Sequence, residues 1–294
     1  TKESKMGFSK LSEIIEESEN TKKPFWEVVL ENDCRERNIA EAESVKQMQG
    51  LLDVMKNADK NYDPKLRSPS RMAGGDGAKL EEFRKKENRL IGDFLTMVME
   101  KAVKMGESNA CMKRIVAMPT AGSCGVIPAV LLSYAEYKQV PDETIVQALY
   151  VAGGIGEVIA TSASISGAEG GCQAEIGSAS AMAAGALTYL EGGDNTKIIH
   201  AVALALKNML GLTCDPVAGL VEVPCIKRNV SGAVNAVITS QMVMAGIQSA
   251  IDPDETIDAM RRIGRQIPVC LKETGLEGLA TTATARKLNK RLTK

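Results

Sequence analysis

The spacing of hydrophobic residues along the chain predicts helices. Apolar residues recur at helical intervals over residues 25–55, with a polar stretch at 33–43, and again over residues 79–105. The segment between them, residues 60–77, is rich in Gly and Pro and predicts a loop. Pro253 and the acidic residues after it predict a helix that runs to about Ile267. No segment alternates apolar and polar residues over the length of a strand, so we expect an all-α fold.

Charged residues are scarce in the middle of the chain. Residues 115–251 hold 15 charged side chains in 137 positions, whereas the other 157 positions hold 58. This block is also rich in Ala, Gly and Ser, and helices without a charged face are typically buried. We therefore expect one compact helical domain over residues 1–294 with a buried central helix region rich in small residues. Residues 1–113 are expected to form a more charged helical flank.

One uncharged stretch is long enough to cross a bilayer. Residues 229–251 carry no charge over 23 positions. Eight of their side chains are polar, which favours a helix buried in a globular protein over a membrane span. We expect no membrane association.

Composition narrows the class of protein further. The chain has 36 basic and 37 acidic residues, and this balance argues against nucleic-acid binding. Aromatic residues make up only 3%, so the core must be largely aliphatic. The seven cysteines are odd in number and widely spaced, and the charged first 19 residues do not resemble a secretory signal. We expect reduced thiols and a cytoplasmic location.

Three polar segments are candidates for chemistry. The first is residues 119–125, where Thr120, Gly122 and Ser123 precede a helix-like stretch at 126–137. Amide groups at such a helix start favour an anion such as a carboxylate. The segment lacks the Gly-Lys-Ser/Thr of a phosphate-binding loop, and an ordinary helix-capping turn explains it as well.

The second segment is residues 164–178, a glycine-rich polar loop inside the uncharged block. It contains Ser164, Ser166 and Cys172, with Glu169 and Glu175 on either side of the thiol. Burying such a loop is costly unless its polar groups are paired or bind a ligand. A structural loop between two buried helices is the alternative interpretation.

The third segment, residues 211–229, contains Cys214 and Cys225. Neighbouring prolines keep both cysteines out of helix interiors, and the positive charges of Lys227 and Arg228 near Cys225 favour the thiolate. No Cys-x-x-Cys pair is present, so spacing alone leaves three buried structural cysteines as the simpler interpretation. Three thiolates holding a [4Fe–4S] cluster would leave one iron open to act as a Lewis acid.

These segments closely resemble the α subunit of bacterial iron–sulfur-dependent L-serine dehydratase. The matching segments are 119–125, 163–180, 207–229, 272–280 and, more loosely, 72–76. The resemblance implies a [4Fe–4S] cluster and conversion of L-serine to pyruvate and ammonia, without pyridoxal phosphate, in amino-acid catabolism and gluconeogenesis. It implies that the cluster ligands are Cys172, Cys214 and Cys225, with sulfurs roughly 6–7 Å apart. We expect the substrate to contact Thr120, Gly122, Ser123, Ser164, Ser166 and Lys227.

The resemblance also implies a partner. Single-chain relatives begin with a further domain that carries histidine motifs, whereas this chain has only His200, which matches no such motif and is expected to be structural. We therefore expect a heterodimer in which a separate β subunit supplies the catalytic base. No ligand role is expected for Cys34, Cys111, Cys124 or Cys270, and the fourth ligand of the cluster is left open.

Two other functions remain open at this stage. One is a lyase that eliminates sulfide from L-cysteine on the same type of cluster. The other is a non-catalytic metal-binding or regulatory subunit.

Overall fold

The computed structural model describes residues 7–87 and 89–292, and these residues form thirteen α-helices. These ranges contain no β-strand, and their only β pairing is an isolated bridge between Cys214 and Lys272. The all-α prediction is therefore confirmed. The helices are α1 (Leu11–Thr21), α2 (Phe25–Arg37), α3 (Glu41–Lys60), α4 (Asp76–Arg84), α5 (Asp93–Ala110), α6 (Val126–Lys138), α7 (Asp142–Ser162), α8 (Gly167–Gly170), α9 (Ser178–Leu190), α10 (Asn195–Met209), α11 (Cys225–Met244), α12 (Pro253–Gln266) and α13 (Ala283–Leu292).

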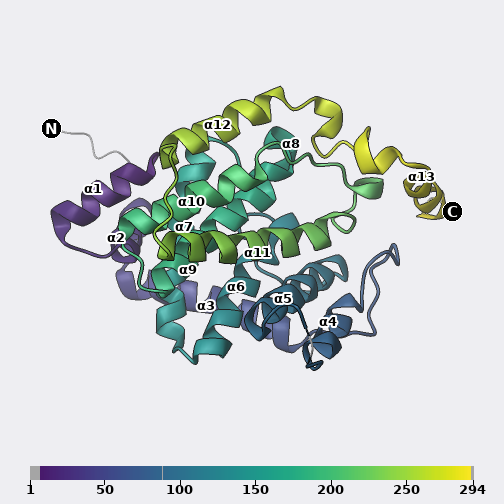
Figure 1. The fold of residues 1–294 in the computed structure, drawn as a ribbon, viewed down its shortest axis with the longest axis horizontal. Coiled ribbons are helices and arrows are strands. Elements are labelled where there is room, and N and C mark those ends of the chain that lie inside the picture. Colours follow the sequence, from purple (N-terminus) through teal and green to yellow (C-terminus); the bar gives the residue numbers. More distant parts are fainter. Residues whose placement is uncertain (1–6, 88, 293–294) are drawn as a thin grey trace.

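Helix α9 lies inside the molecule and is covered by α6, α7, α10 and α11 (Figure 1). Its residues 178–188 are all buried, as the small side chains of this segment predict. Gly185 shows why small residues are needed, because a Cβ atom there would lie 2.3 Å from Cδ1 of Ile155 in α7. The close approach of these helices forms the centre of an aliphatic core.

Helix α7 is the one helix among the described residues that is long and apolar enough to cross a membrane. Its apolar stretch is 67% buried, and it packs against α2, α3 and α9. This burial is that of a core helix. The uncharged stretch 229–251 is helical only over its first part. Helix α11 ends at Met244, and Gly246 follows with a φ of 94°, so residues 245–251 are not helical.

Two expected helical segments are each divided. The segment 25–55 forms α2 and α3, because Asn38 ends α2 in a left-handed conformation with a φ of 51°. The segment 79–105 forms α4, which already begins at Asp76, and α5, which begins at Asp93. The helix expected from Pro253 to about Ile267 is found as α12.

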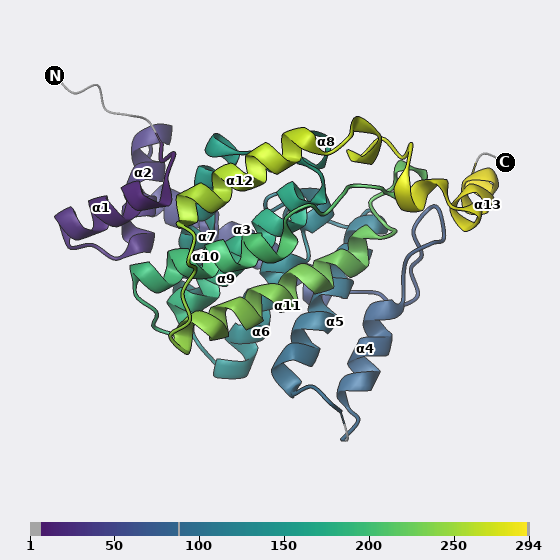
Figure 2. The same ribbon diagram turned by 45° about the horizontal axis from the view of Figure 1, so that its top comes forward.

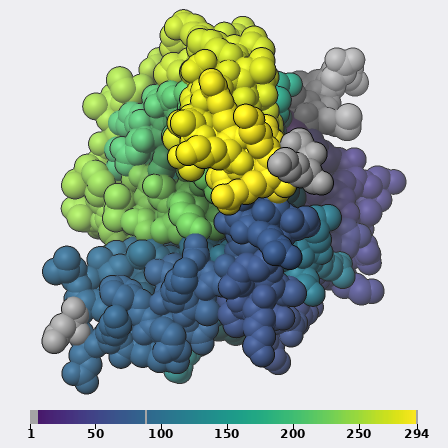
Figure 3. Space-filling model, turned by 90° about the vertical axis from the view of Figure 1, so that its right-hand side faces the viewer, coloured from purple at the N-terminus to yellow at the C-terminus, as the bar shows by residue number. Residues whose placement is uncertain are grey.

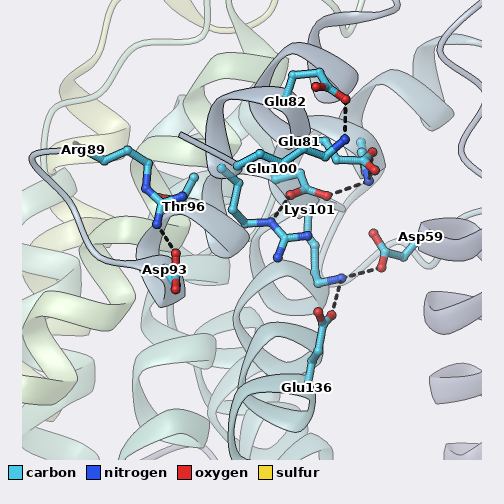
Figure 4. A network of polar contacts seen from close by, with 12 residues as sticks. Asp59, Glu81, Glu82, Arg89, Asp93, Thr96, Glu100, Lys101 and Glu136 are labelled. Atoms are coloured by element: carbon cyan, nitrogen blue, oxygen red, sulfur yellow. Dashed lines mark hydrogen bonds and ion pairs between the residues drawn. The ribbon is translucent and has the colours of Figure 1, made fainter. Parts of the chain in front are cut away.

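The charged flank is less solvated than its sequence indicates. Lys101 in α5 is buried, with Nζ 2.6 Å from Oδ2 of Asp59 and 3.1 Å from Oε2 of Glu136 (Figure 4). Lys104, one turn later, pairs with Glu100 and Glu81. Burial lowers the pKa of Lys101, but its two carboxylate partners outweigh this effect and hold the pKa above its usual value. Paired charges therefore allow a charged helix to be buried.

Residues 62–77, which precede and begin α4, form a strap that reaches toward the C-terminal part of the chain (Figures 1 and 2). The buried carboxylate of Glu107 in α5 accepts hydrogen bonds from the amides of Gly74, Asp76 and Gly77 and from the Tyr62 hydroxyl. A cavity of about 380 Å³ separates residues 69–72 of the strap from α13, and Figure 3 shows this face of the molecule.

Candidate active site

The loop that carries Cys172 is bound to the loop before Cys214. Gly171, with a φ of 76°, turns the chain into Cys172, and a single turn of π-helix, Gln173–Gly177, leads on to α9. The amide of Gln173 donates to the carbonyl oxygen of Leu212 over 3.0 Å, and its side chain accepts from the amide of Gly211 over 2.9 Å. These bonds place the second and third sequence segments side by side.

Cys214 is held by the segment after α12. Its amide donates to the carbonyl oxygen of Leu271 over 2.9 Å, and its carbonyl oxygen accepts from the amide of Glu273 over 2.7 Å. Asp215, the next residue, accepts a hydrogen bond from the amide of Leu279 over 2.8 Å. The conformation at Cys214 therefore depends on residues 271–279.

Cys225 is the first residue of α11, and Asn229 connects it to the first segment. The buried Asn229 side chain donates to the carbonyl oxygens of Cys225 and Gly122 and accepts from the amide of Gly125 over 2.8 Å. On the other side, Glu222 accepts hydrogen bonds from Ser68 and Ser70 of the strap. The start of α11 is thus held by two separate parts of the chain.

The three cysteines are buried, and they are close enough for the charge of one thiolate to raise the pKa of another. Their exposed fractions are 2% for Cys172, 3% for Cys214 and 9% for Cys225. Burial raises the pKa of Cys172 to about 11 and that of Cys225 to about 12. Burial also raises the pKa of Cys214, and the nearby Glu175, Cys172 and Cys225 raise it further. Thiols with pKa values raised this far are protonated at neutral pH unless a bound cation converts them to thiolates.

Arg228 brings positive charge to this group. Its guanidinium donates to the carbonyl oxygen of Thr213 over 2.8 Å and pairs with the buried carboxylate of Asp215 over 2.9 Å. Its charge opposes the effect of burial on the pKa of Cys172. Arg228 thus fixes the loop around Cys214 and favours the thiolate form of Cys172.

Glu175 lies where the three sequence segments meet. Its Oε1 accepts a hydrogen bond from the Thr120 hydroxyl over 2.9 Å, and its Oε2 lies 3.8 Å from the sulfur of Cys214. Cβ atoms on Gly122 and Gly167 would lie 3.2 and 2.6 Å from its carboxylate oxygens. Burial raises the pKa of this carboxyl group, and the hydrogen bond from Thr120 lowers it.

The other predicted contact residues have different surroundings. Ser123 and Thr120 form a reciprocal cap around the short 3₁₀ turn Ala121–Ser123, whose first amides have no acceptor within the turn. Ser164 donates to Glu169 over 2.7 Å, and Ser166 stands at the start of α8. These side chains belong to the loops around the thiols.

Lys227 and His200 are engaged elsewhere. The ammonium group of Lys227 lies 2.6 Å from Oδ2 of Asp76 in the strap, and the side chain is largely exposed. Nδ1 of His200 accepts a hydrogen bond from the amide of Ser249, which agrees with a structural role. Cys124 is as buried as the three central thiols, but its thiol faces the carbonyl oxygen of Met105.

The three buried thiols are donors of the type that holds iron–sulfur clusters in proteins. Among residues 7–87 and 89–292, no group of three His, Cys, Asp or Glu side chains is arranged to hold one metal ion. Three buried thiols with raised pKa values gain most from a bound cationic group that converts them to thiolates. Arg228 and the positive end of α11 at Cys225 would offset the charge of three such thiolates.

Sequence reasoning did not assign roles to two residues of this site. In the sequence, Asn229 is one of the polar residues of an uncharged stretch, and Glu175 is one of two acidic residues beside Cys172. A polar side chain inside a nearly uncharged block was the signal for both, because burial of such groups requires partners or a ligand. Their partners come from segments that are distant in sequence, so the signal could not identify them.

Known proteins match nearly the whole chain. A family model described as serine dehydratase alpha chain matches residues 20–280. The probable L-serine dehydratase alpha chain of Bacillus subtilis (strain 168) is 43% identical over 285 residues, which cover 97% of this chain and 95% of that protein.

Two further relatives differ in how much of their own length the match covers. The L-serine dehydratase alpha chain of Peptoniphilus asaccharolyticus is 39% identical over 95% of this chain and 96% of its own length. The L-serine dehydratase of Helicobacter pylori (strain ATCC 700392 / 26695) is 34% identical, and the match covers 94% of this chain but only 62% of that protein. With matches of this extent, the chain belongs to the serine dehydratase alpha chain family.

Proposed function

We propose that this chain is the catalytic subunit of an L-serine dehydratase, a lyase that converts L-serine to pyruvate and ammonia. The observation that carries the proposal is the match to two alpha chains over 95% or more of each protein. The family model spans 261 residues, 20–280, which supports treating the whole chain as one catalytic domain. All seven cysteines are free, which supports a reducing, cytoplasmic location.

We assign the cofactor to the three buried thiols. Cys172, Cys214 and Cys225 would hold a [4Fe–4S] cluster, and no pyridoxal phosphate is required. When bound, such a cluster supplies an open iron that acts as a Lewis acid toward the hydroxyl group of serine. The protein supports this assignment with buried thiols, with Arg228 beside Cys172, and with the positive end of α11 at Cys225.

The substrate would bind beside the thiols. The turn that contains Thr120, Gly122 and Ser123 is fixed against α11 by Asn229, so its first amides are held ready for the substrate carboxylate. Ser164 and Ser166 lie on the loop before Cys172 and are further contacts in this proposal. Lys227 is a weaker candidate, because its ammonium group is paired with Asp76.

We assign the base that removes the α-proton to a partner β subunit. Such a base must lie within hydrogen-bonding reach of the proton. The single imidazole of the chain, on His200, already accepts a hydrogen bond from Ser249. Exposed apolar side chains at Val223, Val269 and Leu276 lie on segments next to Cys214 and Cys225, and they would be covered by a partner.

The test is anaerobic purification of the chain, alone and co-expressed with its partner, followed by iron analysis and a pyruvate assay. We expect about four irons per protein and pyruvate formation from L-serine by the pair, with little by the chain alone. Equal turnover by the fully loaded isolated chain would overturn the assignment of the base to the partner.

The same preparation separates the two alternative functions. Faster release of sulfide from L-cysteine than of pyruvate from L-serine would identify a cysteine lyase. Iron binding without turnover of either amino acid by the assembled pair would identify a non-catalytic metal-binding subunit.

A further inference from the structure

A cavity of about 230 Å³ lies between α12 and the loop that leads to Cys172. One wall is formed by residues from 163–174 and the other by residues from 260–265. No cysteine lines the cavity, and neither does any residue of the turn 119–125; of the proposed substrate contacts, Ser164 alone does. The cavity is therefore separate from the three thiols and from the turn proposed to bind the substrate carboxylate.

The two walls of the cavity are fixed against each other. Nε2 of Gln173 in the loop donates to the carbonyl oxygen of Met260 in α12 over 3.0 Å. Beside this bond, Gly264 packs so closely on the loop that a Cβ atom there would lie 3.0 Å from Cα of Gly170. The cavity is thus formed before any ligand binds, and its size suits a small molecule.

The charged side chains that line the cavity have both signs. Arg261 and Arg265 lie one turn apart on the same face of α12, and Glu169 lies on the loop opposite. Arg261 pairs with Asp258, whereas Arg265 and Glu169 form no ion pair within the part of the chain that the structure describes. Glu169 accepts a hydrogen bond from Ser164 over 2.7 Å. Arg265 and Glu169 are both exposed, so a ligand from solution can reach both charges.

We propose that this cavity binds a small zwitterionic α-amino acid, with its carboxylate on Arg265 and its ammonium group on Glu169. Glu169 would repel a simple anion, and the two arginines would repel a simple cation, whereas a zwitterion satisfies both charges. The inference goes beyond the proposed function, because the site lies apart from the thiols. The bound amino acid connects α12 to the loop that carries Cys172 and thereby stabilises this loop.

The experiment is titration calorimetry of the full chain with L-alanine, which carries both charges but has no hydroxyl group to eliminate. Propionate lacks the ammonium group and ethylamine lacks the carboxylate, so these two probes test each charge separately. Variants Arg265→Gln and Glu169→Gln are compared with Arg262→Gln, which removes an exposed arginine of α12 that does not line the cavity. Hydrogen exchange with and without L-alanine then locates the bound probe.

We expect L-alanine to bind wild type and Arg262→Gln equally well. Arg265→Gln and Glu169→Gln should each weaken binding about tenfold or more, because each variant loses a charge-assisted hydrogen bond. Propionate and ethylamine should bind wild type more weakly than L-alanine by a similar factor. L-Alanine should slow exchange of the amides in residues 163–174 and in α12.

Four results would overturn the inference. The first is no binding of L-alanine to the wild-type chain, and the second is equal binding to Arg265→Gln. The third is propionate binding as tight as that of L-alanine, which would identify a site for plain carboxylates. The fourth is protection confined to residues 119–125 and 211–229, which would place the amino acid at the proposed substrate site. None of these measurements requires iron or turnover, so a failure of the proposed function leaves this test unaffected.

Discussion

The hydroxyl group of Thr120 donates a hydrogen bond to Oε1 of Glu175 over 2.9 Å. This bond joins the turn before α6 to the π-helical turn before α9, two segments separated by α6, α7 and α8. It also opposes the effect of burial, which raises the pKa of Glu175. Thr120 and Glu175, one on each segment, thus fix the position of the two segments that form the proposed substrate site.

Thr120→Val should raise the KM for L-serine about tenfold, because loss of a hydrogen bond to a charged group costs about 1.5 kcal/mol or more. Thr120→Ser keeps the hydroxyl group and should stay within about threefold of wild type. Thr239→Val removes a buried hydroxyl from α11 that bonds only to helix carbonyl oxygens, and it should leave KM unchanged. Steady-state kinetics of the assembled enzyme measure all three, and an unaltered KM in Thr120→Val contradicts the role.

Serine substitution at Cys172, Cys214 or Cys225 should abolish iron retention and pyruvate formation. Cys124→Ala is the matched control, since burial raises the pKa of Cys124 to about 12, as it does for Cys225. Iron analysis after anaerobic reconstitution should give wild-type content for this control. Serine substitutions at Cys34, Cys111 and Cys270 should also retain iron and turnover, and iron loss in Cys270→Ser would make it a further ligand.

Lys101→Met should lower the free energy of unfolding by about 3 kcal/mol, because breaking a buried ion pair leaves a carboxylate without compensation. Asp59, whose side chain is only 18% exposed, is the partner left behind. Lys85→Met breaks an exposed pair with Glu82 and should cost less than about 1 kcal/mol. Urea unfolding curves compare the two, and equal effects would show that the network around α5 is not stabilising.

Glu157 should make the protein less stable as pH rises above 4.5, the ordinary pKa of its carboxyl group. Burial raises its pKa in the folded state above the ordinary value of 4.5, although the Phe8 amide and Asn32 donate hydrogen bonds that act in the other direction. The folded state therefore holds this proton more strongly than the unfolded state, and stability falls as pH passes from the unfolded to the folded pKa.

In Glu157→Gln this dependence is absent. The stability of the variant relative to wild type should therefore increase over the same pH range. Urea unfolding at several pH values measures the difference, and a difference that does not vary with pH would contradict the prediction.

The sequence was sufficient to predict the helices and a buried central helix region, because hydrophobic spacing and small side chains determine local packing directly. Helix ends were predicted less well. Asn38 and Gly246 end helices through left-handed backbone conformations, and the hydrophobic pattern continues past both positions. The helix that contains α5 was predicted, but its burial was not, because Lys101 is expected at the surface unless partners such as Asp59 and Glu136 are brought to it by the fold.

The candidate site was predictable only in part, and for a physical reason. The polar loops around Cys172 and Cys214 stand out against an uncharged background. Their mutual arrangement depends on contacts such as Asn229 with Gly122, which join residues more than a hundred positions apart. The sequence pattern identifies which residues are unusual, whereas the tertiary fold determines which of them are in contact.

Besides the Arg228 ion pair, the hydrogen bonds that hold Cys214 and Asp215 come from Leu271, Glu273 and Leu279. The loop can therefore take its final shape only after residue 279 has been synthesised. A nascent chain would present Cys172 and Cys225 without the third thiol in position. Any group bound by all three must consequently be inserted after residue 279 has been synthesised.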